Sequence, residues 1–292
     1  MEYNAVDMVE QEKGNVLITG ASTGIGKASA LLLDRSGYKV FAGVRNSQVG
    51  ELLKAEGSVR LSPVVLDITD MEQVISAVKT VTEAIGPDRG LTGLVNNAGI
   101  VVPGPLEFLP LNALRQQIEV NVIGQVAVTQ AFLPLIRKGG GRIINIGSGS
   151  GHIVLPFLGA YCISKYAIEA MTDAFRRELK PWKIHVSIVA PGTVETHIWD
   201  KGYAEADRLM AGLSTPAKEL YTNTFSSARK IVEKARRRAI PAEVVAQAVR
   251  KALEARRPKI CYAVGADARI AVISKFLPDR LIDWLVEKTL GH

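Results

Sequence analysis

A tyrosine and a lysine, Tyr161 and Lys165, stand four residues apart in the segment AYCISKYAI (160–168). On a helix, two side chains with this spacing lie on the same face, one turn apart. An ammonium group beside a phenol favours the phenolate and lowers the phenol pKa, which is about 10 in free tyrosine. The pair could therefore act as a general acid and base near neutral pH. The alternative is an ordinary pair on a helix surface, and the rest of the chain must decide between the two.

Two further polar residues accompany this pair. Ser148 follows the apolar run RIINI (142–146) and precedes Tyr161 by thirteen residues. Asn121 lies in VNVIG, inside a long segment with helical periodicity. Alone, a serine or asparagine in such a place is usually a cap or a turn residue. Their interest depends on which elements bring them next to Tyr161.

The elements that must position these residues alternate in type. Short β-branched apolar runs predict strands, and the longer segments of helical period between them predict helices. The predicted strands are 15–19, 39–44, 59–66, 91–97, 142–146, 185–190 and 259–264, and the predicted helices lie near 24–36, 47–56, 70–84, 110–137, 159–180 and 242–255. Strands that are apolar on both faces and alternate with helices indicate a doubly wound parallel α/β sheet of about seven strands, with helices on both faces. Ligands of such sheets bind beyond the carboxyl ends of the strands.

Length and composition place the chain among ordinary globular proteins. It has 292 residues, of which 47% are hydrophobic and 22% charged. It has no uninterrupted run of eighteen apolar residues, so we expect no membrane-spanning helix. The N-terminus is acidic and lacks the apolar core of a secretory signal. We expect residues 1–13 to form a flexible arm and residues 14–292 to form one catalytic domain.

Charge and cysteine usage narrow the location and the partners. The two cysteines provide no disulfide framework, which favours a reducing, cytoplasmic compartment. No cluster has metal-ligand spacing, so no metal is predicted. The net charge of +7 comes partly from basic runs at 229–238 and 250–259. These runs indicate solvated helix faces, with an anionic cofactor or an acidic lipid as the alternative. Nothing accompanies them that indicates a nucleic-acid-binding module.

A glycine-rich turn follows the first predicted strand. The segment GASTGIG carries Gly20, Gly24 and Gly26 between a strand and a helix. Glycines permit a tight turn and let backbone N–H groups approach a pyrophosphate, and the helix N-terminus favours negative charge. The hydroxyls of Ser22 and Thr23 could add donors. The turn therefore predicts a dinucleotide site, with a purely structural turn as the alternative.

Taken together, these motifs resemble the short-chain dehydrogenase/reductase family, and the long tail after the last predicted strand (265–292) resembles that of its steroid- and retinol-dehydrogenase branch. The resemblance runs from about residue 14 to 196 and covers TGxxxGIG, NNAG (96–99), the Ser148, Tyr161 and Lys165 set, and PGTVET (191–196). It implies a Rossmann-like fold and reversible reduction of a carbonyl by a nicotinamide cofactor. It also implies a catalytic tetrad of Asn121, Ser148, Tyr161 and Lys165.

The resemblance assigns a role to each member of the tetrad. Tyr161 is expected to exchange the proton, with Lys165 lowering its pKa and orienting the nicotinamide ribose. Ser148 is expected to stabilise the charge on the substrate oxygen, and Asn121 to hold a water that relays protons to solvent. The residues expected at the cofactor are Gly20, Ser22, Thr23, Gly24, Ile25, Gly26, Arg45, Asp67, Ile68, Asn97, Ala98, Gly99, Val120, Tyr161, Lys165, Pro191, Gly192, Val194 and Thr196.

Two strand ends refine the cofactor prediction. Enzymes that prefer NAD usually carry an acidic residue after the second strand, where this chain has Val44 followed by Arg45. A guanidinium suits a 2′-phosphate, so NADP(H) is favoured and NAD(H) is the alternative. After the third strand, Asp67 is expected to accept from the adenine amino group, with Ile68 against the ring. Asp67 could instead cap the next helix, but Thr69 and Asp70 are better placed for that.

The C-terminal third bears on the substrate. The segment 197–240 is rich in large apolar residues and is expected to be a lid over a bulky lipophilic alcohol or ketone. The segment GHIVLPFLG, before Tyr161, is expected either to line the pocket or to pack in the core. The extension 265–292 carries an apolar stripe that could pack on the lid, on a partner subunit of a homodimer or homotetramer, or on a membrane surface. Reduction of a 3-oxoacyl thioester and non-catalytic sensing of the dinucleotide are the competing functions.

Overall fold

The computed structural model describes residues 12–290 and contains one seven-stranded parallel sheet. The strands are β1 (Asn15–Ile18), β2 (Lys39–Val44), β3 (Leu61–Val65), β4 (Gly93–Asn96), β5 (Arg142–Ile146), β6 (His185–Pro191) and β7 (Cys261–Val264). All seven predicted strands are confirmed. Their spatial order is β3-β2-β1-β4-β5-β6-β7, so the winding direction reverses between β1 and β4. A crevice for a ligand is expected at that reversal, at the carboxyl ends of the strands.

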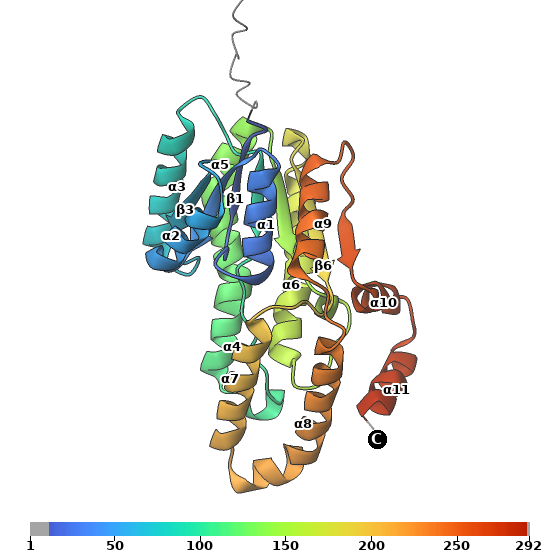
Figure 1. The fold of residues 1–292 in the computed structure, drawn as a ribbon. Coiled ribbons are helices and arrows are strands. Elements are labelled where there is room, and N and C mark those ends of the chain that lie inside the picture. The colour runs from blue at the N-terminus through green and yellow to red at the C-terminus, as the bar shows by residue number, and fades with distance from the viewer. Residues whose placement is uncertain (1–11, 291–292) are drawn as a thin grey trace, which may run out of the picture.

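Helices cover both faces of the sheet (Figure 1). The helices are α1 (Gly24–Arg35), α2 (Ser47–Glu56), α3 (Met71–Ile85), α4 (Leu111–Ile118), α5 (Gly124–Gly139), α6 (Gly159–Glu178), α7 (Ile198–Gly212), α8 (Thr215–Arg236), α9 (Ala242–Glu254), α10 (Ala266–Ser274) and α11 (Asp279–Leu290). Four short helices complete the list: η1 (Leu106–Phe108), the π-helix η2 (Glu119–Ile123), η3 (Gly149–Gly151) and η4 (Lys180–Trp182). The doubly wound α/β architecture is therefore confirmed.

The core consists mainly of two apolar layers, one on each face of the sheet. Helices α1 and α9 bury one layer, with Leu33 and Val249 among its fully buried members. Helices α3 and α5 bury the other, around Val81 and Phe132. Both layers follow from the sequence, because strands that are apolar on both sides need a helix on each face.

Four helices were not among the predicted ones. Helices α7 and α8 form a hairpin that projects away from the sheet (Figure 1). Helices α10 and α11 follow the last strand, and α11 lies beside α8 of this hairpin. The basic run 229–238 falls mostly on α8. Its Arg229 and Arg236 pair with Asp207 and Asp200 of α7 at 2.6 and 2.9 Å. The run is thus largely a solvated helix face, as expected, and its ion pairs join the two helices.

One continuous helical segment bears on the expectation that no helix spans a membrane. Among residues 12–290, the segment Leu111–Gly139 is long and apolar enough to cross a membrane by length and composition alone. It has no uninterrupted run of eighteen apolar residues, but the polar residues within it do not lower its mean hydropathy enough to fail this test. The segment comprises α4, η2 and α5, and its α5 part packs on α3 and β4. A core helix of a soluble protein passes the same test, so the finding is weak as a membrane signal and the expectation stays a prediction.

Candidate active site

The turn after β1 requires glycine at two positions. Gly20 and Gly24 have φ of +64° and +55°, which side chains rarely adopt. A Cβ on Gly20 would lie 2.8 Å from Ala98 Cα, and one on Gly24 would lie 2.8 Å from Thr196 Cγ2. Thr23, which directly precedes Gly24, is the N-cap of α1, but its side chain makes no capping hydrogen bond. The first N–H groups of α1 therefore remain available to an anion.

Thr19 ties this turn to the end of β4. Its Oγ1 accepts hydrogen bonds from the backbone N–H groups of Asn97 and Ala98, both at 3.0 Å. In return, Asn97 Nδ2 donates to the carbonyls of Thr19 and Gly20 at 2.9 and 3.0 Å. The end of β4 is thereby fixed against the glycine turn. The sequence analysis missed Thr19, although its place at the end of a strand and next to the glycine turn was a usable signal.

Tyr161 and Ser148 meet at the carboxyl end of β5, and Lys165 lies beneath them. Ser148 is the N-cap of η3, and its side chain is hydrogen-bonded to the Tyr161 phenol. Lys165 is 5% exposed, and its Nζ donates to the Ile146 carbonyl at 2.8 Å. The same Nζ lies 5.5 Å from the centre of the Tyr161 ring. The structure thus brings together three of the four residues that the sequence nominated.

Burial dominates the pKa values of this pair. It raises the pKa of Tyr161 to about 12, and the hydrogen bond to Ser148 offsets only part of that effect. Burial also lowers the pKa of Lys165 to about 8, although the negative charge of Glu169 acts in the opposite direction. The Tyr161 pKa was predicted to lie below that of free tyrosine, and in this structure it lies above it. The largest cause is desolvation of the phenol, which depends on the fold and not on the spacing of Tyr161 and Lys165.

The fourth nominated residue, Asn121, braces the loop after β4. It lies in the π-helix η2, where a helix gains an extra residue per turn. Its Oδ1 accepts from Ile100 N at 2.8 Å, and its Nδ2 donates to Ile100 O and Ser164 Oγ, both at 3.0 Å. Both Nδ2 donors are therefore used by protein groups, and Oδ1 already accepts one hydrogen bond. The observed role of this side chain is to fix the loop at Ile100.

Gln117, one turn before Asn121, also holds the loop after β4 in place. It was not among the residues nominated from the sequence. It is fully buried. Its Oε1 accepts from Val102 N at 2.7 Å, and its Nε2 donates to Ile100 O at 2.9 Å. A glutamine on the buried side of a predicted helix was the available signal. Together with Asn121, it fixes the course of the chain beyond NNAG.

A second ionisable pair lies behind Lys165. His152 Nε2, at the end of η3, lies 3.2 Å from Oε1 of Glu169, one turn after Lys165 on α6. Both atoms are buried, and neither makes another hydrogen bond within residues 12–290. Burial raises the pKa of Cys261 on β7, and the Glu169 carboxylate adds to that effect. Glu169 is therefore a partly buried acid whose charge acts on the candidate catalytic lysine.

The residues nominated for the outer part of a nucleotide site lie at the ends of β2 and β3. Val44 is buried at the end of β2, and Arg45 behind it is exposed and unpaired within the described part of the chain. Asp67 accepts from the N–H and hydroxyl of Thr69 at 3.0 and 2.7 Å. Asp70, as anticipated, caps α3 by accepting from the N–H groups of its first turn. Asp67 is thus free of a capping role and keeps one carboxylate oxygen without a partner among residues 12–290.

The loop after β6 carries the last nominated residues and contacts the C-terminal extension. Asp267 of α10 accepts from Thr193 N at 2.6 Å, and its carboxylate occupies the space that a side chain on Gly192 would need. Val194 is buried and pairs with Ile240 by a β-bridge. The extension therefore holds this loop in place. Asp267 was missed because it lies 74 residues further along the chain.

The architecture and this site define a class of protein. A glycine turn that feeds a helix N-terminus lies at the winding reversal of a parallel sheet, beside a hydrogen-bonded serine–tyrosine pair with a buried lysine. The space at Gly20, Gly24 and Gly99 admits no side chains without shifts, since a Cβ on Gly99 would lie 3.3 Å from Asn121 Oδ1. These residues fit a dinucleotide lying along the strand ends. Within residues 12–290, no group of three or more His, Cys, Asp or Glu side chains could hold a metal ion.

Comparison with known proteins agrees with this class. The family description "short chain dehydrogenase" matches residues 14–207. A 3-amino-tetrahydro-pyrrolizinone reductase from Xenorhabdus hominickii is 44% identical over 72% of this chain and 72% of its own. Retinol dehydrogenase 7 from Mus musculus is 35% identical over 92% and 87% of the two chains. The human 17-beta-hydroxysteroid dehydrogenase type 6 is 35% identical over 94% and 88%.

A solved structure shares the fold. It is a short chain dehydrogenase from Burkholderia cenocepacia in complex with NADP, with a TM-score of 0.72 and 26% identity, covering 94% of this chain and 98% of that one. This chain belongs to the short-chain dehydrogenase family and resembles its steroid- and retinol-dehydrogenase branch. It is therefore an oxidoreductase that acts on CH–OH groups or the corresponding carbonyls.

Proposed function

We propose that the protein is an NADP(H)-dependent oxidoreductase that interconverts an alcohol with a ketone or aldehyde on a lipophilic, steroid-, retinoid- or lipid-like substrate. The observation that carries the proposal is the hydrogen-bonded Ser148–Tyr161 pair with buried Lys165 beneath it, at the same sheet edge as the glycine turn. Relatives named for retinol and for hydroxysteroids support the substrate class.

In the reduction, each protein group has one task. Tyr161 donates its phenolic proton to the substrate oxygen, and Ser148 donates a hydrogen bond to the same oxygen as charge develops on it. When bound, the reduced nicotinamide supplies the hydride to the carbonyl carbon. The Lys165 ammonium then stabilises the phenolate that remains, which matters because burial alone disfavours that anion. Asn121 fixes the loop beneath the reacting groups, and water at its backbone returns a proton from solvent.

The placement of the nominated residues supports the following cofactor contacts. The N–H groups of the glycine turn and of α1 would hold the pyrophosphate, and the loop from Pro191 to Thr196 would contact the nicotinamide half. Asp67 and Ile68 would hold the adenine, while Asn97, Ala98, Gly99 and Val120 would contact the rest of the cofactor. Arg45 is exposed and unpaired within the described chain, so its guanidinium is free to meet a 2′-phosphate.

Arg45→Ala is therefore expected to raise the KM for NADPH by about 10- to 100-fold, the effect of losing a charge-assisted hydrogen bond. The KM for NADH should change by less than about twofold. Steady-state kinetics with each cofactor measure both values. Arg35→Ala is the matched control, because Arg35 is exposed at the other end of α1. Equal loss with NADH and NADPH would show that Arg45 does not read the 2′-phosphate.

Glu169→Gln is expected to change the pH profile of ketone reduction. The Glu169 carboxylate raises the pKa of Lys165, which burial holds at about 8. Removal of that charge lowers the Lys165 pKa further, so the ammonium is lost at lower pH. The alkaline limb of kcat/KM, near pH 8 in the wild type, should therefore move to lower pH. Groups that face Glu169 from the neighbouring elements are His152 of η3 and Cys261 of β7.

The measurement is kcat/KM for a ketone with NADPH from pH 6 to 10, at constant ionic strength. Glu178→Gln is the control, since Glu178 is exposed at the end of the same helix. An unchanged alkaline limb in Glu169→Gln would show that Glu169 does not act on Lys165.

The domain organisation supports a lipophilic substrate. We regard residues 14–292 as one catalytic domain, residues 197–240 as the lid and residues 265–292 as an extension that packs beside the lid. Residues 1–13 were expected to be a flexible arm, and residues 1–11 of it lie outside the described part. A small cavity under the lid is lined mainly by apolar side chains, among them Trp199, Phe157 and Phe225. Phe157 also packs edge to face with Tyr221 and Phe225 of α8.

Two competing functions remain distinguishable by experiment. Reduction of a 3-oxoacyl thioester would show as NADPH oxidation with an acetoacetyl thioester but with none of a panel of steroids, retinal and medium-chain ketones. A non-catalytic dinucleotide sensor would bind NADPH and turn over no carbonyl on the panel. The intact Ser148, Tyr161 and Lys165 constellation favours catalysis, so we expect turnover of a bulky apolar carbonyl.

We further propose a homodimer or homotetramer in the cytoplasm. The π-helix η2 and helix α6 expose apolar residues, including Ile123 (50%), Ile163 (45%) and Tyr166 (44%), which suit an interface between copies. Light scattering of the purified protein tests this. Peripheral contact with a membrane through residues 265–292 is the alternative use of the exposed extension.

A further inference from the structure

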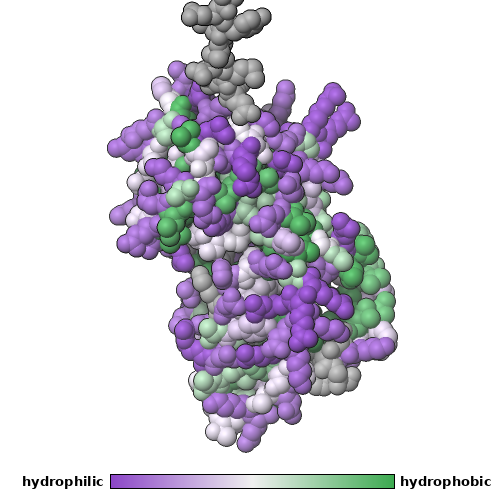
Figure 2. Space-filling model, viewed as in Figure 1, coloured by the Kyte–Doolittle hydropathy of each residue, from purple (hydrophilic) through white to green (hydrophobic). Residues whose placement is uncertain are grey.

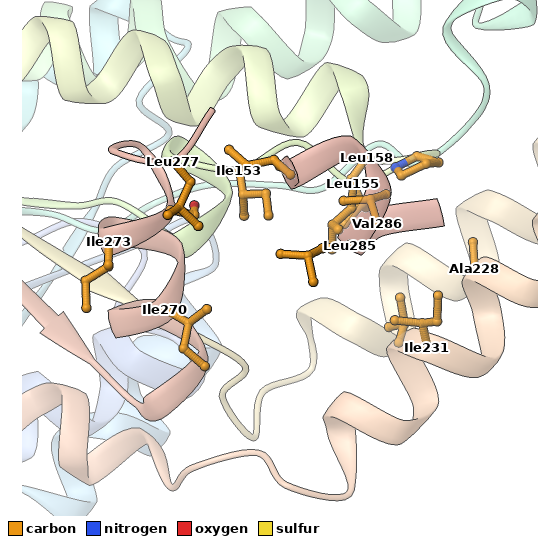
Figure 3. Close-up of a pocket in the computed structure, with 14 residues that line it drawn as sticks. Ile153, Leu155, Leu158, Ala228, Ile231, Ile270, Ile273, Leu277, Leu285 and Val286 are labelled. Carbon is orange, nitrogen blue, oxygen red and sulfur yellow. The ribbon is translucent and has the colours of Figure 1, made fainter. Parts of the chain in front are cut away.

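A large apolar cavity lies outside the catalytic constellation. It has a volume of about 320 Å³ and lies between the loop after η3, helix α8, and the helices α10 and α11 of the extension (Figure 3). Its lining residues are Ile153, Leu155, Pro156, Leu158, Ala228, Ile231, Val232, Ile270, Ile273, Ser274, Leu277, Ile282, Leu285 and Val286. Neither Ser148, Tyr161 nor Lys165 lines it. We call it the extension cavity.

The chemistry of the lining restricts the ligand. Ser274 is the one polar residue among the fourteen, and its hydroxyl already donates to the Ala271 carbonyl at 2.8 Å. A polar or charged ligand would lose its hydration here without gaining hydrogen bonds from the lining side chains. An apolar ligand has no such hydration to lose. The cavity volume also lies within the range of about 300–1,000 Å³ that is typical of small-molecule sites. The extension cavity therefore fits a hydrocarbon group.

The extension cavity adjoins the space under the lid. A smaller cavity of about 60 Å³ shares four of its lining residues, namely Pro156, Leu158, Ala228 and Val232. The smaller cavity is also lined by Val101, which follows NNAG by two residues. Leu158, common to both, precedes Tyr161 by three residues. The two apolar cavities therefore share a wall, and this wall includes a residue one turn before Tyr161.

We propose that the extension cavity binds the distal hydrocarbon tail of the substrate, while the carbonyl lies at Tyr161 and Ser148. This inference rests on the proposed carbonyl reduction and adds that the substrate is elongated, with an apolar end remote from the reacting group. The wall that this cavity shares with the one under the lid favours a substrate tail over other occupants. Two of its lining residues, Ile270 and Ile273, are also 67% and 62% exposed, so the cavity borders an apolar surface. Figure 2 shows a hydrophobic patch on the right of the molecule, in the region of α10 and α11.

The test uses straight-chain 2-ketones from butan-2-one to dodecan-2-one with NADPH. Each methylene buried in an apolar site improves transition-state binding by about threefold. In the wild type, kcat/KM should therefore rise with chain length, and the ratio between the longest and shortest ketone should exceed about a hundredfold. Ile273→Trp fills the mouth of the extension cavity, so this ratio should fall by at least about tenfold.

A matched control and a binding measurement separate the proposal from the activity itself. Ile75 on α3 is as exposed as Ile273, at 61%, and lies far from the cavity, so Ile75→Trp should keep the wild-type ratio. Dansylamino-undecanoic acid, a fluorescent hydrocarbon-chain probe, should bind the wild type and Ile75→Trp without any cofactor. Its affinity for Ile273→Trp should be at least about tenfold weaker.

The outcomes are distinct. In one outcome, Ile273→Trp weakens probe binding, but the wild type reduces no ketone. This would contradict the proposed reaction, and the substrate role of the cavity with it. An unchanged ratio and unchanged probe affinity in Ile273→Trp would overturn the cavity proposal and leave the reaction standing. Loss of binding to phosphatidylcholine vesicles in Ile273→Asp, with the chain-length ratio intact, would make this face a lipid contact. A shift from dimer to monomer in Ile273→Asp, again with the ratio intact, would make it an interface between copies.

Discussion

Tyr161→Phe is expected to lower kcat for carbonyl reduction by about a thousandfold. The substitution removes a single oxygen from the group proposed to donate the proton, and general acid catalysis contributes about 10²- to 10⁴-fold in enzymes. The ring itself remains, so packing around the phenol should persist. Stopped-flow and steady-state measurements of NADPH oxidation with a ketone substrate give kcat directly.

The control for this variant lies on the same helix. Tyr166 is 44% exposed, five residues further along α6, and Tyr166→Phe should keep wild-type kcat. NADPH binding, followed by its fluorescence, should be within about threefold of wild type in both variants. A Tyr161→Phe enzyme with undiminished kcat would remove Tyr161 from the mechanism.

Lys165→Met is expected to lower kcat/KM by about a hundredfold. The phenolate left on Tyr161 after proton transfer is costly in this buried site, where the pKa of the phenol is raised to about 12. An ammonium close to the phenol favours the phenolate by about one to three pKa units, and methionine offers the same length without the charge. The kcat/KM of the variant should be nearly independent of pH, whereas that of the wild type should fall as pH rises past about 8, the pKa of Lys165.

The pH dependence of kcat/KM in Lys165→Met distinguishes loss of the ammonium charge from a packing defect. A structural defect would lower the rate equally at every pH without removing the alkaline limb. Lys180→Met is the matched control, because Lys180 is exposed just after the same helix. Circular dichroism checks that each variant is folded. A Lys165→Met enzyme that keeps the wild-type limb near pH 8 would show that another group titrates there.

Local sequence patterns were sufficient for the sheet. Runs such as VFAGV and IINI are apolar on both faces, and only a strand with helices above and below can bury both. Each predicted strand is present, and the glycine turn, NNAG and Ser148 follow strands at the carboxyl edge, as expected. The helices of the lid and the extension were not predicted, because no strand follows closely to mark them as crossovers.

The candidate site was only partly readable from the sequence. The i, i+4 spacing of Tyr161 and Lys165 fixed their common face, and the structure joins them to Ser148. The direction of the Tyr161 pKa was not readable, because it depends on how completely the fold removes water from the phenol. The engagement of the Asn121 amide was equally hidden, since its partners Ile100 and Ser164 come from two other segments.

The sequence by itself thus determined the element types, the order of the motifs and the chemistry that their residue types allow. All of these depend on neighbours within a few residues, where backbone geometry and side-chain period act directly. Tertiary structure alone decided which buried groups meet: Glu169 with His152, Asp267 with the loop after β6, and the extension with α8. These contacts join residues 17 to 74 or more positions apart, so their desolvation, charge and cavity shape exist only once the chain is folded.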